Sequence, residues 1–149
     1  MNKKVISEIN YNKVASEINK DNREKGFWDT ERNIGELLML ITSELGEAME
    51  AHRKGKFADL KGFIEHMNKA PEDSSALPNE FYLNVTDELT LYRKEAFEKY
   101  IKDSFEDEIA DAMIRLFDLA GGLKIDLDQH IFYKLLYNKT RERLHGKKY

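Results

Sequence analysis

The sequence predicts an all-α fold of the four-helix-bundle type, and three observations support this prediction. The longest segments repeat apolar residues at three- and four-residue spacing, which is the period of an amphipathic helix. Only 2 prolines occur in 149 residues. A hydrophobic content of 41% is enough to fill one core. We therefore expect a single domain over residues 1–149, made of four main helices and an insertion.

The first half of the chain predicts two of these helices. The first loses its apolar pattern within residues 21–26. Its apolar positions are Val5, Ile9, Val14 and Ile18. The second is expected to begin at a cap formed by Asp29 or Thr30 and to end near Lys54 and Gly55. Its apolar face consists of Ile34, Leu37, Leu38, Ile41, Leu45 and Ala48.

The second half predicts an insertion followed by two further helices. From about residue 57 to residue 104 the periodicity breaks into short pieces, and residues 70–78 have the composition of a loop. A long helix should then end at the glycine pair 121–122, in a left-handed cap. Its apolar positions are Phe97, Ile101, Phe105, Ile109, Ala112, Leu116 and Leu119. The last helix is expected to begin at Asp126, with Gln129 completing a capping-box-like start.

Composition excludes several classes of function. The net charge of −4 gives no long-range attraction for nucleic acids or anionic membranes, so neither is expected as a partner. The chain has no cysteine, which excludes disulfides, thiolate metal sites and a cysteine nucleophile. The N-terminus lacks a signal-peptide pattern, and no apolar run is long enough to span a bilayer. We expect a soluble cytoplasmic protein.

Two pairs of acidic residues stand out on the two long helices. Glu44 and Glu47 form one pair, and Glu108 and Asp111 form the other, each at spacing i, i+3. Helical residues three apart share a face, so each pair can direct two carboxylates toward one point. At about 100° per residue, Glu44 and Glu108 fall inside the apolar stripes of their helices, and the other two lie at the edges. Both pairs should therefore face the core.

Four inward carboxylates need a counter-charge. Burying one without compensation costs roughly several kcal/mol, whereas a whole domain is stable by only about 5 to 15 kcal/mol. A divalent cation would supply the charge, and an all-oxygen ligand set favours Mg²⁺, with Mn²⁺ as a second choice. The alternative for either pair alone is an ordinary solvated helix face. Two pairs at matching positions make that alternative weaker.

The residues around these pairs resemble the MazG-like, all-α nucleoside-triphosphate pyrophosphatase superfamily. The resemblance rests on Ser43–Gly55, with its Ser-Glu-Leu-Gly-Glu-Ala motif, and on Phe105–Gly121, with Asp-Glu-Ile-Ala-Asp. Residues 137–143 resemble the closing helix of that superfamily. The resemblance implies Mg²⁺-dependent hydrolysis of a nucleoside triphosphate to the monophosphate and pyrophosphate, in nucleotide-pool house-cleaning. It also implies a homodimer or tetramer.

For this hydrolysis, all four carboxylates are assigned as metal ligands: Glu44, Glu47, Glu108 and Asp111. Glu44 and Glu47 are in addition the catalytic candidates for orienting or deprotonating the attacking water. The division of roles among the four stays open at this point. The family pattern is also interrupted, because 60 residues separate Glu47 from Glu108. This long spacer leaves the substrate preference open, and its length is thermodynamically tolerable.

Four other residues are candidates for binding the substrate. Asn138 falls on the apolar face of the last helix, where its amide needs a partner, and Lys139 lies at the edge of that face. Lys54 could contact phosphate, with solvent exposure as the alternative. Trp28 could stack on a base, with core packing as the alternative. His52 is expected to be a packed core histidine and is left out of the site.

The acidic pairs have two competing interpretations. A di-iron carboxylate bundle would need Glu-x-x-His on two helices, and neither acidic motif has it. A catalytically silent helical dimerisation or interaction module is the alternative from a different functional class. Metal binding distinguishes the two interpretations. The stability of such a module should not change with Mg²⁺ or Mn²⁺, whereas that of a metal-dependent enzyme should.

Overall fold

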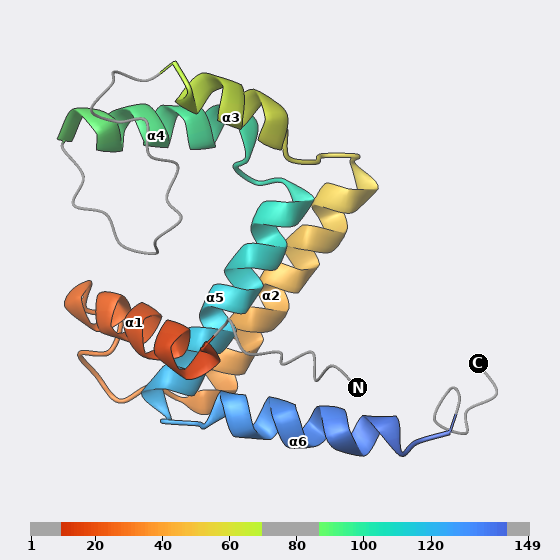
Figure 1. Ribbon diagram of the computed structural model, residues 1–149. Coiled ribbons are helices and arrows are strands. Elements are labelled where there is room, and N and C mark those ends of the chain that lie inside the picture. The colour runs from red at the N-terminus through yellow and green to blue at the C-terminus, as the bar shows by residue number, and fades with distance from the viewer. Residues whose placement is uncertain (1–9, 70–86, 143–149) are drawn as a thin grey trace. The chain divides into compact units, whose positions relative to one another are not determined.

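The computed structural model describes residues 10–69 and 87–142, and these parts of the chain are helical without any strand (Figure 1). The predicted all-α class is thereby confirmed. The helices are α1 (Tyr11–Glu24), α2 (Ile34–Arg53), α3 (Leu60–Met67), α4 (Asp87–Tyr100), α5 (Phe105–Gly122) and α6 (Leu127–Lys139). None of these helices is long and apolar enough to cross a membrane.

The chain divides into two compact units. The terminal unit comprises Met1–Leu38 and Met113–Tyr149, and the central unit comprises Met39–Ala112. The boundaries fall within α2 and α5, so each of these helices contributes to both units. A single domain with an insertion stays a prediction, because compactness alone does not establish which segments fold independently.

In the central unit, α3 lies beside α4 (Figure 1). The Tyr92 hydroxyl donates to the His66 carbonyl at 2.8 Å, and the His66 ring lies 4.6 Å from the Tyr92 ring. Met67 of α3 and Ala96 of α4 are buried. The predicted loop over residues 70–78 lies outside the described residues. The part of the insertion that the structure describes is therefore mostly helical.

In the terminal unit, α1 contacts the start of α6. The Asp128 carboxylate accepts hydrogen bonds from the Tyr11 and Asn12 backbone N–H groups at 3.0 and 3.3 Å. The Asn12 side chain in turn donates to Asp126 at 2.8 Å and accepts from the Leu127 N–H at 2.7 Å. The free N–H groups of two helix N-termini are thus satisfied by side chains of the opposite helix. The Val5 and Ile9 positions predicted for the first helix lie outside the described residues.

Several predicted helix ends are confirmed and one start is wrong. Helix α2 ends at Arg53, followed by Gly55 at φ +66°, and the Asp126 carboxylate caps α6 by accepting from the Gln129 N–H. However, α2 begins at Ile34 rather than after Asp29 or Thr30. Its cap is Asn33, whose side chain accepts from the Glu36 N–H at 3.2 Å. The segment before it is instead held in a turn, where Asp29 N donates to the Gly26 carbonyl.

The long helix predicted through Phe97 and Leu119 is in fact two helices, α4 and α5. Asp103 between them has φ +54°, a left-handed conformation that no α-helix continues through. Ser104 then starts α5, since its hydroxyl accepts from the Asp107 N–H at 3.3 Å and its carbonyl from the Glu108 N–H. The spacing of Phe97, Ile101 and Phe105 fits a continuous helix, so periodicity alone could not reveal the break.

The glycine pair at the end of α5 has a different role from the predicted one. The left-handed residue after this helix is Lys124, at φ +54°, and neither glycine has positive φ. A Cβ atom added to Gly121 would collide with the Ala15 carbonyl, and one added to Gly122 would collide with the Trp28 ring. Both glycines therefore permit close packing against α1 and Trp28 in place of a cap.

Candidate metal centre

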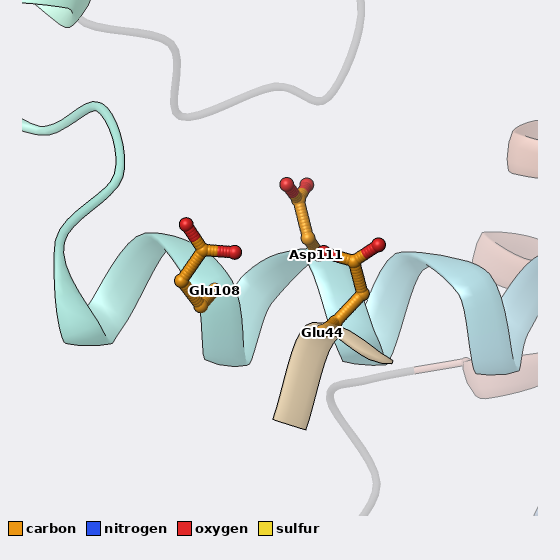
Figure 2. A group of neighbouring side chains, drawn as sticks. All are labelled: Glu44, Glu108 and Asp111. Carbon is orange, nitrogen blue, oxygen red and sulfur yellow. The ribbon is translucent and has the colours of Figure 1, made fainter. Parts of the chain in front are cut away.

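Three carboxylates of the central unit converge on one point (Figure 2). Glu44 comes from the middle of α2, and Glu108 and Asp111 come from the first two turns of α5. One ligand oxygen from each lies within 4.8 Å of the other two. Figure 2 shows Glu108 and Asp111 on the same side of α5, as the i, i+3 spacing requires. The Ser104 cap fixes where α5 begins and so sets the direction of both side chains.

Burial confirms the inward positions of Glu44 and Glu108, but the expectation that both acidic pairs face the core is wrong for Glu47 and Asp111, because these two lie at the edges of the apolar stripes. Glu44 and Glu108, placed inside the apolar stripes, are only 6% and 7% exposed. Glu47 and Asp111, placed at the stripe edges, are exposed. Glu47 lies outside the group of three whose oxygens converge, although its charge still acts on Glu108. The two buried carboxylates, Glu44 and Glu108, thus form the floor of the cluster. The exposed carboxylates Asp111 and Glu47 form its rim.

Electrostatics make this cluster unfavourable without a cation. Burial is the largest effect that raises the pKa of Glu108 above its ordinary value. The negative charges of Glu47, Asp107, Asp111 and Glu44 raise that pKa further. A carboxyl group whose surroundings disfavour its ionised form gains most from a nearby positive charge. The surroundings of Glu108 therefore disfavour its ionised form, and a nearby positive charge would offset this effect.

The donor set fits a hard divalent ion. All three side chains offer carboxylate oxygens, which are the ligands that Mg²⁺ prefers in proteins. Two oxygens on one Mg²⁺ ion lie at most about 4.2 Å apart, so side chains with oxygens within 4.8 Å need only small rotations to share an ion. The exposed Asp111 and Glu47 leave one side of the cluster open to solvent.

Two other residues of the central unit bear on the predictions. The Lys54 ammonium pairs with Glu50 at 3.2 Å, and its side chain is 67% exposed, so its predicted phosphate contact stays a prediction. His52 is exposed, and the expectation of a core histidine is wrong. Its ring contacts Phe57 and Phe105 edge to face, at 5.9 and 5.5 Å between centroids. These aromatic rings hold the loop after α2 close to the start of α5.

The remaining predicted substrate residues belong to the terminal unit. Trp28 is half-buried, with the Arg23 guanidinium 4.9 Å above its ring and its edge beside Gly122. The Asn138 amide oxygen is buried without a hydrogen-bond partner in the described structure, in line with the inward orientation predicted for it. Lys139 is exposed. Their roles in substrate binding stay predictions.

A buried carboxylate that the sequence prediction did not assign lies beside Trp28. Asp118 is 9% exposed and accepts hydrogen bonds from the Trp28 indole N–H at 3.0 Å and from the Asn19 amide at 2.7 Å. Arg23 donates to the Asn19 oxygen at 2.8 Å. The sequence signal for this contact is that the indole N–H of a packed tryptophan needs a hydrogen-bond acceptor.

Comparison with protein families, curated proteins and solved structures finds no match for this chain.

Proposed function

We propose that this chain is a Mg²⁺-dependent nucleoside-triphosphate pyrophosphatase of the MazG-like kind. The observation that carries the proposal is the convergence of Glu44, Glu108 and Asp111 from two helices, two of them buried. The motif resemblance supplies the reaction, which is hydrolysis of the α-β phosphoanhydride bond to give a nucleoside monophosphate and pyrophosphate. House-cleaning of the nucleotide pool is the physiological role that follows from this reaction.

The roles of the side chains follow from their burial. Glu44 and Glu108 form the buried floor that would hold the ion, and Asp111 would hold it from the rim. When bound, Mg²⁺ supplies positive charge to the phosphate oxygens as negative charge develops there. Glu47 is exposed and its charge acts on Glu108, which supports it as the group that would orient the attacking water and accept its proton. Glu44 is the second candidate for this step.

The test is a hydrolysis panel on the full chain with Mg²⁺. Canonical and oxidised ribo- and deoxyribonucleoside triphosphates serve as substrates, and released pyrophosphate is the readout. Activity that is lost in Glu47→Gln and retained in Glu95→Gln would support the proposal, because Glu95 is an exposed glutamate on α4 of the same unit. Release of orthophosphate alone, or equal activity in both variants, would refute it.

The alternative is a catalytically silent helical interaction module. Many large apolar side chains of the described residues are exposed, and such surfaces often bind protein partners, which favours this alternative. Thermal unfolding distinguishes the two, since an ion that binds only the folded chain at 100 times its Kd adds about 2.7 kcal/mol of stability. An unfolding temperature that does not respond to Mg²⁺ or Mn²⁺, together with an inactive panel, would favour the module.

A further inference from the structure

The C-terminal part of the chain is strongly basic, although the chain as a whole is acidic. Residues 130–149 contain six of the 24 Lys and Arg residues but only one of the 28 Asp and Glu residues. The net charge of −4 alone predicts no nucleic-acid partner, but it averages over two regions of opposite sign. Attraction to a polyanion depends on the surface that meets it, because charges more than about 10 Å away are largely screened at about 0.1 M salt. This basic region includes most of α6.

One face of α6 combines aromatic rings with cations. At about 100° per residue, four of its residues lie within about 100° of one another on the helix surface: His130, Tyr133, Lys134 and Tyr137. All four are exposed, with Tyr133 at 61% and Tyr137 at 57%. The Lys134 ammonium lies 5.2 Å from the centroid of the Tyr137 ring, and the guanidinium of Arg141, just after the helix, lies 6.0 Å from it. These five residues form the aromatic–basic face of the terminal unit.

The acidic residues at the start of α6 are engaged elsewhere. The Asp128 carboxylate accepts hydrogen bonds from two backbone N–H groups at the start of α1. The Asp126 carboxylate accepts from the Asn12 amide and from the Gln129 N–H. Asp128 is the one acidic residue within α6, and it lies about 180° from Tyr137 on the helix surface. No carboxylate of this helix therefore lies on the aromatic–basic face.

We propose that the aromatic–basic face binds single-stranded nucleic acid. Exposed aromatic rings stack on unpaired bases, and this stacking needs no particular base sequence, because every base has a π-face. The adjacent cations neutralise backbone phosphates. At about 1.5 Å per residue, the rings of His130, Tyr133 and Tyr137 follow one another at about 4.5 and 6 Å along the helix axis. That spacing is wider than the roughly 3.4 Å between stacked bases of a duplex strand, and it fits a partly extended single strand.

Two other polyanions fit this face less well. A duplex keeps the faces of its bases inside the stack, so exposed rings gain nothing there and only phosphate contacts remain. An anionic lipid surface selects helices with one apolar side and one basic side. In α6 the apolar and aromatic residues occur on all sides, and both tyrosines lie beside the cations. The mixture of rings and cations on one face therefore favours a strand with accessible bases.

Fluorescence anisotropy of the full chain with labelled oligo(U) and oligo(dT) of about twelve nucleotides tests the proposal. Binding to either strand, with a Kd of about 1 to 100 µM at low salt, is the expected result. Tyr133→Ala and Tyr137→Ala should each weaken it about five- to hundredfold, without weakening binding to a duplex. Tyr133→Phe keeps the ring and should bind like the wild type. Leu91→Ala removes an equally exposed side chain from α4 and is the matched control.

The salt dependence of binding tests the cations separately from the rings. Arg141→Gln should reduce the slope of log K against log salt concentration by about 0.7, which is the value for one phosphate contact with a single strand. Lys94→Gln removes a cation of α4 that is 68% exposed, and it should leave the slope unchanged. A variant that is merely less stable would not change this slope in a defined step.

The measurement is independent of the proposed activity, because the aromatic–basic face belongs to the terminal unit and the carboxylate cluster to the central unit. Binding is measured in chelator, and Glu47→Gln should bind oligonucleotides like the wild type even where it releases no pyrophosphate. A wild type that binds neither strand up to about 1 mM would overturn the proposal. Tyrosine variants that bind like the wild type, or binding to phosphatidylserine vesicles without binding to either strand, would overturn it as well.

Discussion

Glu108→Gln is the substitution that most directly tests the electrostatics of the cluster. We expect it to stabilise the metal-free protein and to abolish pyrophosphate release. The change keeps the shape of the side chain and removes one of the charges that converge in Figure 2. In the metal-free protein this relieves repulsion, and in the metal-bound protein it removes a ligand charge.

The magnitude follows from the geometry. Two unit charges 4.8 Å apart repel by about 0.9 kcal/mol in water and by about 3.5 kcal/mol at an effective dielectric constant of 20. Protonation limits this repulsion, because holding a carboxyl of ordinary pKa 4.5 protonated at pH 7 costs about 3.4 kcal/mol. Burial and the charge of Glu47 are the largest effects on the Glu108 carboxyl, and Glu108→Gln should gain about 1 to 3 kcal/mol. For a chain of this length that is roughly 2 to 10 °C in unfolding temperature.

The gain should depend on pH with a definite sign. Because the folded-state pKa of Glu108 is raised, its contribution to stability is fully present below the unfolded pKa and is lost as the pH rises through the folded pKa. The glutamine variant has no such loss. The difference between the two proteins should therefore be close to zero near pH 4 and increase toward neutral pH.

The assay is thermal unfolding in chelator and in Mg²⁺, from pH 4 to pH 8, beside the pyrophosphate assay. Glu95→Gln is the control for loss of one exposed negative charge in the same unit. A Glu108→Gln protein that is less stable in chelator by about 3 to 5 kcal/mol would refute the reasoning, because that is the result of breaking a buried ion pair. Wild-type turnover in the variant would equally exclude Glu108 from the site.

Three further predictions concern single side chains. Gly121→Ala should destabilise the protein by about 1 to 3 kcal/mol in urea unfolding, because the new Cβ meets the Ala15 carbonyl. Gly46→Ala should stabilise it by about 0.5 to 1 kcal/mol, because a Cβ there enters open space in the middle of a helix. Asp118→Ala should cost about 2 to 4 kcal/mol, since it removes the acceptor of the Trp28 indole N–H and leaves the Asn19 amide with only the backbone carbonyl of residue 118; unchanged stability would exclude this network. Glu47→Gln should abolish turnover with little change in metal-free stability, because the side chain is exposed; a large loss of stability would indicate a structural role instead.

The sequence predicted the buried positions of the cluster because helical geometry determines them. Once α2 and α5 are helices, the 3.6-residue period decides which side of each helix Glu44 and Glu108 occupy. Both are buried, as that period requires, and the edge positions Glu47 and Asp111 are exposed. Helix class and side-chain direction are local properties, so a single sequence suffices to predict them.

The break between α4 and α5 and the role of Gly121 were not predictable in this way. The Phe97, Ile101 and Phe105 spacing continues the helical period through the break, and only the left-handed Asp103 and the Ser104 cap reveal it. The role of Gly121 depends on α1, a helix about a hundred residues earlier in the chain. Sequence periodicity contains no information about which distant backbone approaches a given glycine.

In the described residues, Asp118 and the cluster around Glu108 are buried carboxylate environments that differ in how their charge is compensated. Asp118 accepts neutral donors, the Asn19 amide and the Trp28 indole, so its charge is stabilised by hydrogen bonds that the chain itself provides. Glu108 is surrounded by other acidic groups that raise its pKa, so the chain adds repulsion there. Burial alone is therefore a poor indicator of a metal site. Burial combined with converging like charges is a stronger one, because a bound cation would add an attraction to each carboxylate that offsets their mutual repulsion.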